Sequence, residues 1–429
     1  NLGLVQFMPG NRVEYAPNGP KSNEVHDINI NGTQVLTAKG SVTSNYNNVY
    51  FSCEFFKFRD EKWTSYVIPE ARDAVTIVSN PREPNHFFGG TWGHGIYEYR
   101  NNEMVDSFTI NNTERHTLQT IFPNQNFIRI GGMAFDRDGN LWVTNAGVEN
   151  TLSVRSTEGN WTAFKYDDIV DAPNVADIIV TKNNHKWVQI PNGEGLFVFN
   201  DNGTIDDDSD DQARKLRVID RDENKSFNDV YSLAEDLDGD IWVGTNQGPL
   251  VYYNPESVFD DTNIRADRIV LPIEIAGEGS YLLSNSIITS IAVDGANRKW
   301  LGTAHAGAFL MSANGKNEIH HFTEDNSPLL SNQVKKIAIN HENGEVYFAT
   351  PEGLVSYMGD ATGAGEFFEN VYVFPNPVRE DYVGDITITG LARDVNVKIT
   401  DISGNIVYET TSLGGQAIWN GKKIGRAHV

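Results

Sequence analysis

A seven-residue pattern recurs along residues 25–357 and constrains the fold more than any other feature of the sequence. Its first position is Asp or Thr in the clearest copies, its fourth is always Gly or Asn, and its seventh is usually aromatic. Successive copies lie roughly 45 to 58 residues apart, a spacing typical of repeat proteins built from one supersecondary unit per copy. The copies are Asn29/Gly32/Val35, Arg82/Asn85/Phe88, Asp136/Gly139/Trp142, Thr181/Asn184/Trp187, Asp236/Gly239/Trp242, Asp294/Asn297/Trp300 and His341/Gly344/Tyr347.

Each copy lies inside a pattern typical of three short strands. A β-branched apolar segment such as Ile287–Val293 precedes it, and a Gly-Leu pair followed by an aromatic residue, as in Gly195–Phe199, comes after it. An Asp side chain accepts hydrogen bonds from the amides that come after it, and Gly or Asn tolerates a positive φ, so the pattern predicts a tight turn between the first two strands. We expect the aromatic residue to stand on the second strand and to pack against the next sheet.

The repeated unit is therefore expected to be a β-meander. A small sheet with two apolar faces cannot bury both alone, so successive units must stack against each other. Units of this length with one recurring aromatic position are typical of propeller blades, and no segment sustains a helical period over three turns. The sequence predicts an all-β fold, with a seven-bladed β-propeller over residues 21–357.

Two of the turns, Asp136–Asn140 and Asp236–Asp240, resemble the start of a calcium-binding EF-hand loop. Neither has the bidentate Glu at position twelve or the flanking helices that such a loop needs, so we interpret both as hairpin turns. The sialidase-type Asp box spaces its Asp and Gly two residues apart, whereas they are three apart here. This difference weakens a glycosidase interpretation.

The composition changes after Tyr357. Residues 358–365 are rich in Gly and are expected to be a flexible linker. Residues 366–423 contain short alternating segments and predict a small β-sandwich that is truncated. Residues 424–429 match one reading frame of a common sequencing adapter, so we expect them to be a sequencing artefact.

Four ordered motifs make the tail resemble the C-terminal sorting domain of type IX secretion cargo. They are F-P-N-P-V, with Pro375, Asn376 and Pro377 at its centre, I-T-I-T-G-L at 386–391, V-K-I-T-D-I-S-G at 397–404 and W-N-G at 419–421. The blade sequence at 288–303 resembles the two-component-regulator propeller repeat. In this order, the two parts together resemble the PorZ-type surface components of the type IX secretion machinery, which have two β-propellers and a sorting-type domain.

That resemblance implies a non-enzymatic scaffold at the extracellular face of the outer membrane. It implies two partners, a PorU-type signal peptidase and anionic lipopolysaccharide. It also leads us to expect a fragment of a longer protein, with residues 1–20 as the remnant of a preceding propeller and a signal peptide upstream of Asn1. Either Arg12–Tyr15 or Phe367–Val373 could close the ring, and we favour Arg12–Tyr15, since pairing the first strand with the last blade removes both sheet edges.

Composition excludes several other classes. The chain has 34 Lys and Arg against 58 Asp and Glu, a net charge of −24, with no basic cluster, which argues against nucleic acid as a partner. Cys53 is the single cysteine, so there is no intrachain disulfide and no cysteine-based zinc site. No apolar run approaches the roughly 18 residues of a transmembrane helix. Anionic lipopolysaccharide would therefore need a local basic patch or bound cations on this acidic chain.

We identify no catalytic residue, metal site or cofactor site, and the sequence leaves the ligand-contacting residues unknown. His94, His320 and His321 are interpreted as surface or turn residues. The acidic run Asp206–Asp211 is either a cation site or a solvated loop, and we favour the loop. The aromatic segments Phe55–Phe58 and Phe367–Phe368 are expected to face a neighbouring blade, or else to form an exposed interface.

Two alternative functions stay open. The first is a ligand-sensing propeller of a hybrid two-component system, against which the F-P-N-P tail argues. The second is a glycan-active propeller enzyme, a lyase or glycosidase, which needs paired carboxylates or a metal at the mouth of the propeller. The sequence shows no such pair at comparable loops.

Overall fold

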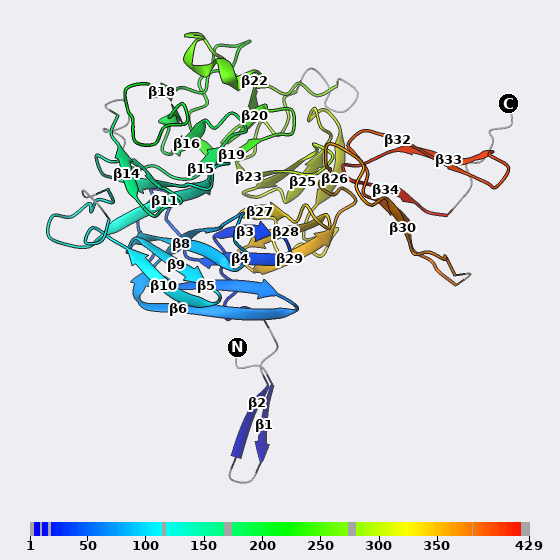
Figure 1. The fold of residues 1–429 in the computed structure, drawn as a ribbon, viewed down its shortest axis with the longest axis horizontal. Helices are drawn as coiled ribbons and strands as arrows, with labels where there is room; N and C mark the ends of the chain where they lie inside the picture. Colours follow the sequence, from blue (N-terminus) through cyan, green and yellow to red (C-terminus); the bar gives the residue numbers. More distant parts are fainter. Residues whose placement is uncertain are drawn as a thin grey trace.

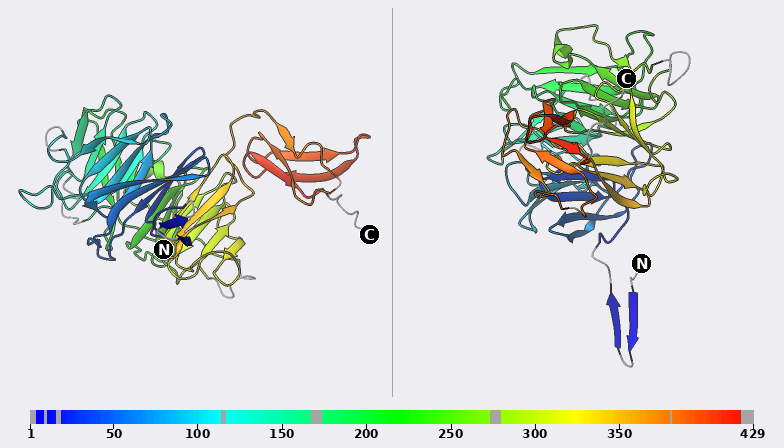
Figure 2. Two further views of the ribbon diagram at one scale, coloured as in Figure 1. Left: turned by 90° about the horizontal axis from the view of Figure 1, so that it is seen from below. Right: turned by 90° about the vertical axis from the view of Figure 1, so that its right-hand side faces the viewer.

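The computed structural model describes residues 4–8, 11–15, 19–113, 117–166, 174–272, 280–379 and 381–421. The fold is nearly all-β, with antiparallel pairing between the strands, and the described residues include a short 3-10 helix, η2 (Pro255–Phe259). Within the described ranges, no helix is long and apolar enough to cross a membrane. Figures 1 and 2 show a broad ring of small sheets, with a smaller β unit at one side.

The ring is built from strands that follow each other in chain order. The first sheets contain β3 (Asp27–Asn31), β4 (Gln34–Lys39), β5 (Ser52–Arg59) and β6 (Lys62–Arg72), then β7 (Ala74–Ser79), β8 (His86–Gly93), β9 (Ile96–Arg100) and β10 (Glu103–Phe108), then β11 (Ile128–Phe135), β12 (Leu141–Ala146), β13 (Leu152–Arg155) and β14 (Trp161–Phe164).

The second half of the ring continues the pattern. It contains β15 (Ile178–Val180), β16 (Lys186–Ile190), β17 (Gly195–Asn200) and β18 (Gln212–Leu216), then β19 (Val230–Glu235), β20 (Ile241–Thr245), β21 (Gly248–Tyr252) and β22 (Asp267–Arg268), then β23 (Ile288–Val293), β24 (Lys299–Thr303), β25 (Ala308–Met311) and β26 (Glu318–Phe322), and last β27 (Lys336–Ile339), β28 (Glu345–Thr350) and β29 (Gly353–Met358).

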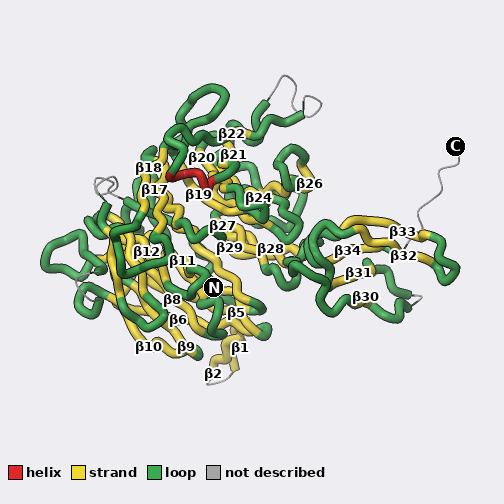
Figure 3. The backbone as a smooth tube through the Cα atoms, turned by 45° about the horizontal axis from the view of Figure 1, so that its top comes forward, coloured by secondary structure: helices red, strands yellow, loops and turns green. Residues whose placement is uncertain are grey.

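The first strand of each group lies innermost. Strands β3, β7, β11, β15, β19, β23 and β27 each contact the next in that order, and β27 contacts β3, which closes the ring. The tube view in Figure 3 follows the chain around this ring. The predicted all-β propeller fold is therefore confirmed.

The number of blades stays a prediction. Strand β8 pairs with β11 at Gly93↔Ile128 and Trp92↔Arg129, so a single eight-stranded sheet contains β7 to β14. Strand pairing alone thus does not separate the second and third sequence units.

The turns between first and second strands have the predicted conformation. The fourth position of every repeat copy has a positive φ, between 57° at Gly32 and 93° at Gly139. In the clearest copies the Asp carboxylate accepts backbone amides, as Asp136 Oδ1 does from Asp138 and Asn140 at 3.0 and 2.8 Å. The hairpin-turn interpretation of Asp136–Asn140 is confirmed.

The repeat aromatics fill the spaces between sheets. Trp142, Trp187, Trp242 and Trp300 are all buried and pack among residues of the following unit, as Trp142 does with Phe197 and Phe199. Two of them also bond to their own turn, because the indole N–H of Trp142 donates to Asp136 Oδ2 at 2.9 Å and that of Trp242 to Asp236 Oδ2 at 3.1 Å. In these two copies a hydrogen bond between the Asp and the Trp of the repeat thus connects the turn to the buried core.

The expected closing strand is not where we placed it. Arg12–Tyr15 lies in β2 (Asn11–Tyr15), which pairs with β1 (Leu4–Met8) in a hairpin that projects from the ring (Figure 1). The sequence signal for this hairpin is Pro9-Gly10, a turn-favouring pair between the two strand segments. The alternative, Phe367–Val373, leads into β30 (Tyr372–Phe374), which pairs with β31 (Ile386–Thr389). In the described residues the sheet of β27, β28 and β29 therefore has three strands.

The tail forms two small sheets. One contains β30, β31 and β34 (Gln416–Trp419), and the other contains β32 (Asn396–Thr400) and β33 (Ile406–Thr411). Their shared core is small and centres on Ile388, Leu391 and Ala417. The residues 422–429, which include the suspected artefact, lie outside the described part.

The segment 358–365 is not a free linker, contrary to expectation. Ala361 and Thr362 are buried, and the Gly363 amide donates to His341 O of the ring. The Gly415 amide of the tail donates to Thr362 O at 3.0 Å. A Cβ on Gly295 would come within 1.7 Å of Thr362 O, so the glycines here permit close packing and not mobility.

Candidate functional site

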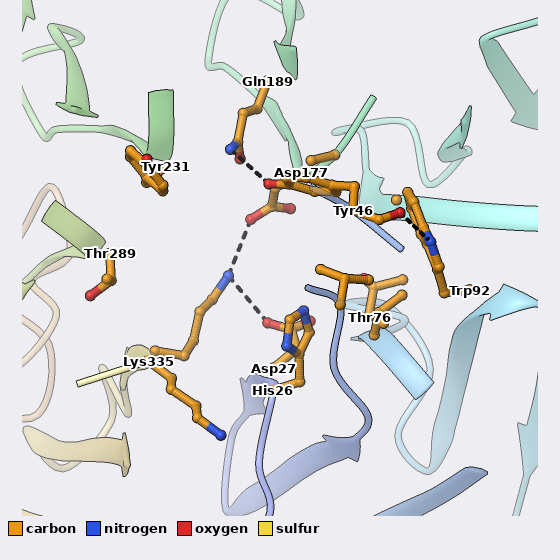
Figure 4. A pocket seen from close by; sticks show the side chains of 15 residues that line it. His26, Asp27, Tyr46, Thr76, Trp92, Asp177, Gln189, Tyr231, Thr289 and Lys335 are labelled. Carbon is orange, nitrogen blue, oxygen red and sulfur yellow. Dashed lines mark hydrogen bonds and ion pairs between the residues drawn. The ribbon is translucent and has the colours of Figure 1, made fainter. Parts of the chain in front are cut away.

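A cavity of about 150 Å³ lies inside the ring, where the innermost strands meet (Figure 4). Its wall takes residues from units all around the ring, among them Asp27 of β3, Thr76 of β7, Tyr231 of β19 and Lys336 of β27. Residues on first strands of successive units point inward because the strands surround a common axis. The cavity is the natural place to look for function, since propeller folds bind ligands in their channels and mouths.

One lysine links two acids across this cavity. Lys336 Nζ lies 3.1 Å from Asp27 Oδ1 on the adjacent unit and 3.1 Å from Asp177 Oδ2, which precedes β15 on the far side. Figure 4 labels both acids and draws the two ion pairs as dashed lines. Asp27 also accepts the Ile77 amide of β7 through Oδ2 at 3.0 Å. The side chains thus tie separate units together.

Burial and charge set the protonation of the cavity. Burial alone would lower the pKa of Lys336, but Asp177 and Asp27 outweigh it and raise that pKa. Burial raises the pKa of Asp27, and Lys336 opposes that change. His26 has its pKa lowered to about 4 by burial, with Lys336 and Lys335 adding to the effect. At neutral pH the cavity therefore contains a charged Lys336 and a neutral His26.

A loop between β4 and β5 reaches into the cavity. Tyr46 O accepts the indole N–H of Trp92 at 3.0 Å, and the Tyr46 hydroxyl accepts from Gln189 Nε2 at 3.3 Å. Gln189 lies on β16, so the loop crosses from the first unit to the fourth along the chain (Figure 4). Burial raises the pKa of Tyr46 to about 12, so its hydroxyl keeps its proton.

Asp73 holds this loop in place. Its side chain is buried, and its Oδ2 accepts the amides of Val49 and Tyr50 at 3.1 and 2.8 Å, while Oδ1 accepts the amide of Phe51 at 2.9 Å. Hydrogen bonds to a carboxylate are stronger than neutral ones. The loop over the channel is therefore pre-ordered by one buried anion.

The arrangement is suited to binding and to holding the ring together. Both cavity acids are paired with Lys336, so neither is a free carboxylate with an adjacent proton donor. Among the described residues, no three His, Cys, Asp or Glu side chains cluster in a way that could hold a metal ion. The space fits several waters or a small polar ligand.

Sequence reasoning missed this site. The signal was present, because Lys336 and Asp27 are charged residues at the start of the first strand of the last and the first unit. Their convergence with Asp177, however, depends on closure of the ring. No local pattern reports it.

The structure places the predicted sorting-motif residues on the tail, far along the chain from the cavity. Pro375, Asn376 and Pro377 directly follow β30, where Pro375 is half-buried and the other two are exposed. Nothing in the structure tests their role. They remain a predicted motif.

The aromatic segments behave differently from each other. Phe55 and Phe56 are fully buried in the sheet interface, as expected. The expectation that Phe367 and Phe368 also face a blade is wrong, because their side chains are 75% and 61% exposed. They precede β30, which belongs to the tail and not to the ring.

The acidic run forms a hydrogen-bonded loop. Asp207 Oδ1 accepts the Ser209 amide at 3.0 Å, and the Tyr166 hydroxyl donates to Asp211 Oδ2 at 2.7 Å.

His321 also makes contacts within the ring. It packs flat on Phe309, with 3.9 Å between ring centroids, and its Nε2 lies 2.8 Å from Ala306 O. These contacts are structural.

The fold and the repeat define a class, the β-propeller proteins. The family model described as "Two component regulator propeller" matches residues 224–247. No curated protein matches the sequence significantly. The match covers the turn Asp236–Asp240 and the strand that bears Trp242.

The chain is similar to PorZ of Porphyromonas gingivalis, described as an essential bacterial surface component of the type-IX secretion system. The two are 28% identical, with a TM-score of 0.76, over 98% of this chain and 59% of PorZ. This chain thus spans less than two thirds of PorZ. The PorZ-type resemblance is confirmed for the propeller, whereas the sorting domain stays a prediction.

Two lyase structures share the fold alone. A catalytically inactive virginiamycin B lyase from Staphylococcus aureus, solved with quinupristin, is 10% identical with a TM-score of 0.53, over 79% of this chain and 96% of the lyase. A streptogramin B lyase is 11% identical with a TM-score of 0.50, over 78% and 92%. At this identity the likeness shows that both are propellers and carries no chemistry.

Proposed function

We propose that this chain belongs to a surface component of the type IX protein secretion machinery and acts there as a non-enzymatic scaffold. The observation that carries the proposal is the similarity to PorZ, which extends over 98% of the chain at 28% identity. The cavity is consistent with such a role, because its charged groups are engaged in holding units of the ring together.

The proposal includes the location and the partners. We place the protein on the extracellular face of the outer membrane, with a PorU-type signal peptidase and anionic lipopolysaccharide as partners in cargo attachment. Support comes from the similarity to a surface component and from the sorting-type motifs of the tail. With a net charge of −24, contact with an anionic glycan must use a local group of cations.

The same proposal covers the domain organisation. Residues 21–357 would be a seven-bladed propeller, residues 358–365 a packed connection and residues 366–423 a sorting-type β-sandwich. The exposed aromatic residues Phe367, Phe368, Tyr372 and Phe374 along the first tail strand are consistent with a unit that meets another surface.

Deletion of the encoding gene in a bacterium with a type IX system tests the function. We expect cargo that carries a sorting domain to lose its attachment to the cell surface, and reintroduction of the gene to restore it. Normal surface attachment in the deletion strain would overturn the proposal.

A binding experiment tests the partners. The purified chain is immobilised and exposed separately to a PorU-type signal peptidase and to anionic lipopolysaccharide, with neutral lipopolysaccharide as the matched control. Retention of the peptidase and of the anionic form alone supports the proposed partners. Equal retention of both lipopolysaccharides would contradict charge recognition.

One observation favours a catalytic alternative. Asp27 and Asp177 converge in the channel, which is the paired-acid arrangement that a glycan-active enzyme needs. Lys336 forms an ion pair with both, so neither presents a free carboxyl group to a substrate. Turnover of polysaccharide substrates that is abolished by Asp177→Asn would support the enzyme and overturn the scaffold.

The repeat itself favours the other alternative. The matched family model is named for two-component regulators, so a ligand-sensing propeller would carry the same repeat. The two roles differ in the effect of deleting the gene, because loss of a sensor changes transcription while cargo attachment persists.

A further inference from the structure

A second cavity of about 350 Å³ lies at three neighbouring turns, and we call it the turn pocket. Its wall includes Gln34, Arg59, Arg82, Asn85 and Glu342. These residues belong to the first, second and last units of the ring, which are adjacent because β27 contacts β3 and β3 contacts β7. Glu342 follows His341, whose carbonyl bonds to the tail connection, so the turn pocket and the tail share one face.

The turn pocket coincides with the least regular copies of the repeat. The other copies begin with Asp or Thr, whose oxygen binds the turn, whereas these three begin with Asn29, Arg82 and His341. They also lack the Trp at the seventh position. The three copies that depart most from the repeat pattern are thus the three whose turns surround the turn pocket.

Gln34 is the first sign of a binding role. Its side chain is 4% exposed, and Oε1 has no hydrogen-bond partner among the residues that the structure describes. Two other units also have a polar residue at the corresponding position, Lys186 and Lys299, and both of these have a carboxylate partner. A buried unsatisfied polar group costs about 1–3 kcal/mol, which a ligand hydroxyl or amide would recover.

The charged groups of the turn pocket are the second sign. Arg59 Nη1 donates to Asn85 Oδ1 at 2.6 Å, which fixes the guanidinium at the pocket, and Nε lies 3.8 Å from Asp60 Oδ2. The Nη2 group is left for a ligand. Arg82 donates to Arg137 O and keeps further N–H groups as well. The Glu342 carboxylate would lie 3.2 Å from a Cβ on Gly32, so a side chain there would crowd it.

We propose that the turn pocket binds an acidic sugar, a hydroxylated ring that carries a carboxylate or a phosphate. The two guanidinium groups match a carboxylate or phosphate, for which arginine provides paired donors. Gln34 and Glu342 match ring hydroxyls, because both present acceptors. The proposal deepens the proposed function and rests on it only for the source of the sugar, a charged surface glycan.

Titration of the full chain with defined sugars tests the proposal. Glucuronic acid and glucose 1-phosphate are compared with glucose and with inorganic phosphate, by calorimetry or by ligand-observed NMR. We expect the two acidic sugars to bind at least roughly tenfold more tightly than the other two, since both charge and hydroxyls are recognised. No binding of either acidic sugar, or equal binding of inorganic phosphate, would overturn the proposal.

Variants assign the binding to this pocket. Arg59→Gln and Gln34→Leu should each weaken acidic-sugar binding by roughly tenfold or more, while Arg217→Gln and Gln333→Leu, at exposed positions outside the pocket wall, should not. Gln34→Leu removes an unsatisfied buried group, so its melting temperature should stay the same or rise. Unchanged sugar affinity in both Arg59→Gln and Gln34→Leu would place any binding elsewhere and overturn the assignment.

The two proposals can fail separately. If cargo attachment depends on the gene but no acidic sugar binds, the turn-pocket proposal alone is overturned. If acidic sugars bind in the turn pocket but the deletion strain attaches cargo normally, the secretion proposal alone is overturned. Comparing free sugars with an acidic oligosaccharide then distinguishes a glycan polymer from a small metabolite as the source.

Discussion

The ammonium group of Lys186 lies 4.1 Å from the ring centroid of Trp142, a residue of the preceding unit. Lys299 repeats the relationship with Trp242 at 4.8 Å. Each lysine directly precedes the aromatic of its own repeat copy, is fully buried, and is neutralised by an acid, Asp201 or Asp236. Cation–π contact and ion pairing thus connect one unit to the next.

Lys299→Met is expected to destabilise the ring. The substitution keeps the apolar stem over Trp242 but leaves the buried Asp236 without its cation, whose Nζ lies 2.8 Å from Oδ2. Removing one partner of a buried pair costs about 3–5 kcal/mol, so the free energy of unfolding in urea should fall by about that amount. The double variant Lys299→Met/Asp236→Asn should recover part of the loss.

The matched control is Lys398→Met, which removes an exposed pair with Glu409 at 3.4 Å. Such pairs contribute less than about 1 kcal/mol. Equal losses in the two lysine variants would show that the buried pair is no more important than a surface one.

Gly239 tests the conformational rule of the repeat. Its φ is 90°, and no neighbouring atom lies within 4 Å of the position that a Cβ would occupy, so only backbone strain opposes substitution. Asn occupies the same position as Asn184 and Asn297, with φ of 63° and 58°. Gly239→Val should therefore lower stability by about 1–2 kcal/mol more than Gly239→Asn does, because β-branched residues tolerate this region least.

Thermal melting of the two Gly239 variants side by side measures the difference. Indistinguishable melting temperatures would mean that the fourth position needs a small or polar residue for some reason other than φ.

Local physics accounts for the features that the sequence revealed. A positive φ at Gly139 or Asn297 needs particular residue types, and a buried Trp142 needs a large apolar side chain, so both leave a local mark. The three-stranded meander follows from them. The propeller could therefore be predicted from one repeated pattern.

Contacts between distant units leave no such mark. Tyr46 reaches Gln189 across 143 residues of chain, and Lys336 meets Asp177 only when the ring is closed. The predicted closing strand was wrong for the same reason, since pairing of β2 with β1 competes with pairing across the whole ring and is entropically cheaper. The central cavity is formed by such contacts between distant parts of the chain, so it could not be predicted from local patterns.

Asp73→Asn is expected to loosen the loop over the channel. A neutral amide offers a single acceptor oxygen where the carboxylate oxygens now receive the amides of Val49, Tyr50 and Phe51. The loss of charge-assisted hydrogen bonds, at about 1.5–3 kcal/mol each, should speed hydrogen exchange of these amides by roughly 10- to 100-fold.

Asp60→Asn is the control, because the Asp60 side chain is 85% exposed and lies 3.8 Å from the Arg59 guanidinium, at the surface. Exchange in residues 49–51 should not change in that variant. If these amides exchange as slowly in Asp73→Asn as in the parent chain, the loop is held by its packing on Trp92 instead.

His26 should make the fold sensitive to mild acid. Its pKa is lowered to about 4 in the folded chain, chiefly by burial, whereas an unfolded His titrates near 6.5. Between these values the unfolded state binds more protons, so stability falls as the pH decreases through this window, by up to about 3 kcal/mol. Urea unfolding of His26→Gln at pH 7 and pH 4.5 should show a smaller loss than the parent chain.

The two proteins differ only at position 26, so the comparison isolates the imidazole. An identical pH dependence in the parent and in His26→Gln would mean that His26 is protonated in the folded state.

Among the strands that the structure describes, only β8 and β11 pair between neighbouring units of the ring. Other neighbouring units meet through side chains and single main-chain hydrogen bonds, such as that from Val334 N–H to Thr303 O at 2.9 Å, whereas at Gly93↔Ile128 and Trp92↔Arg129 a main-chain ladder must also break. Under tension applied through the two ends of the chain, the sheet of β7 to β14 should unfold cooperatively, in one step. The ring would yield first at seams without such a ladder, as where the three-stranded last sheet meets β3.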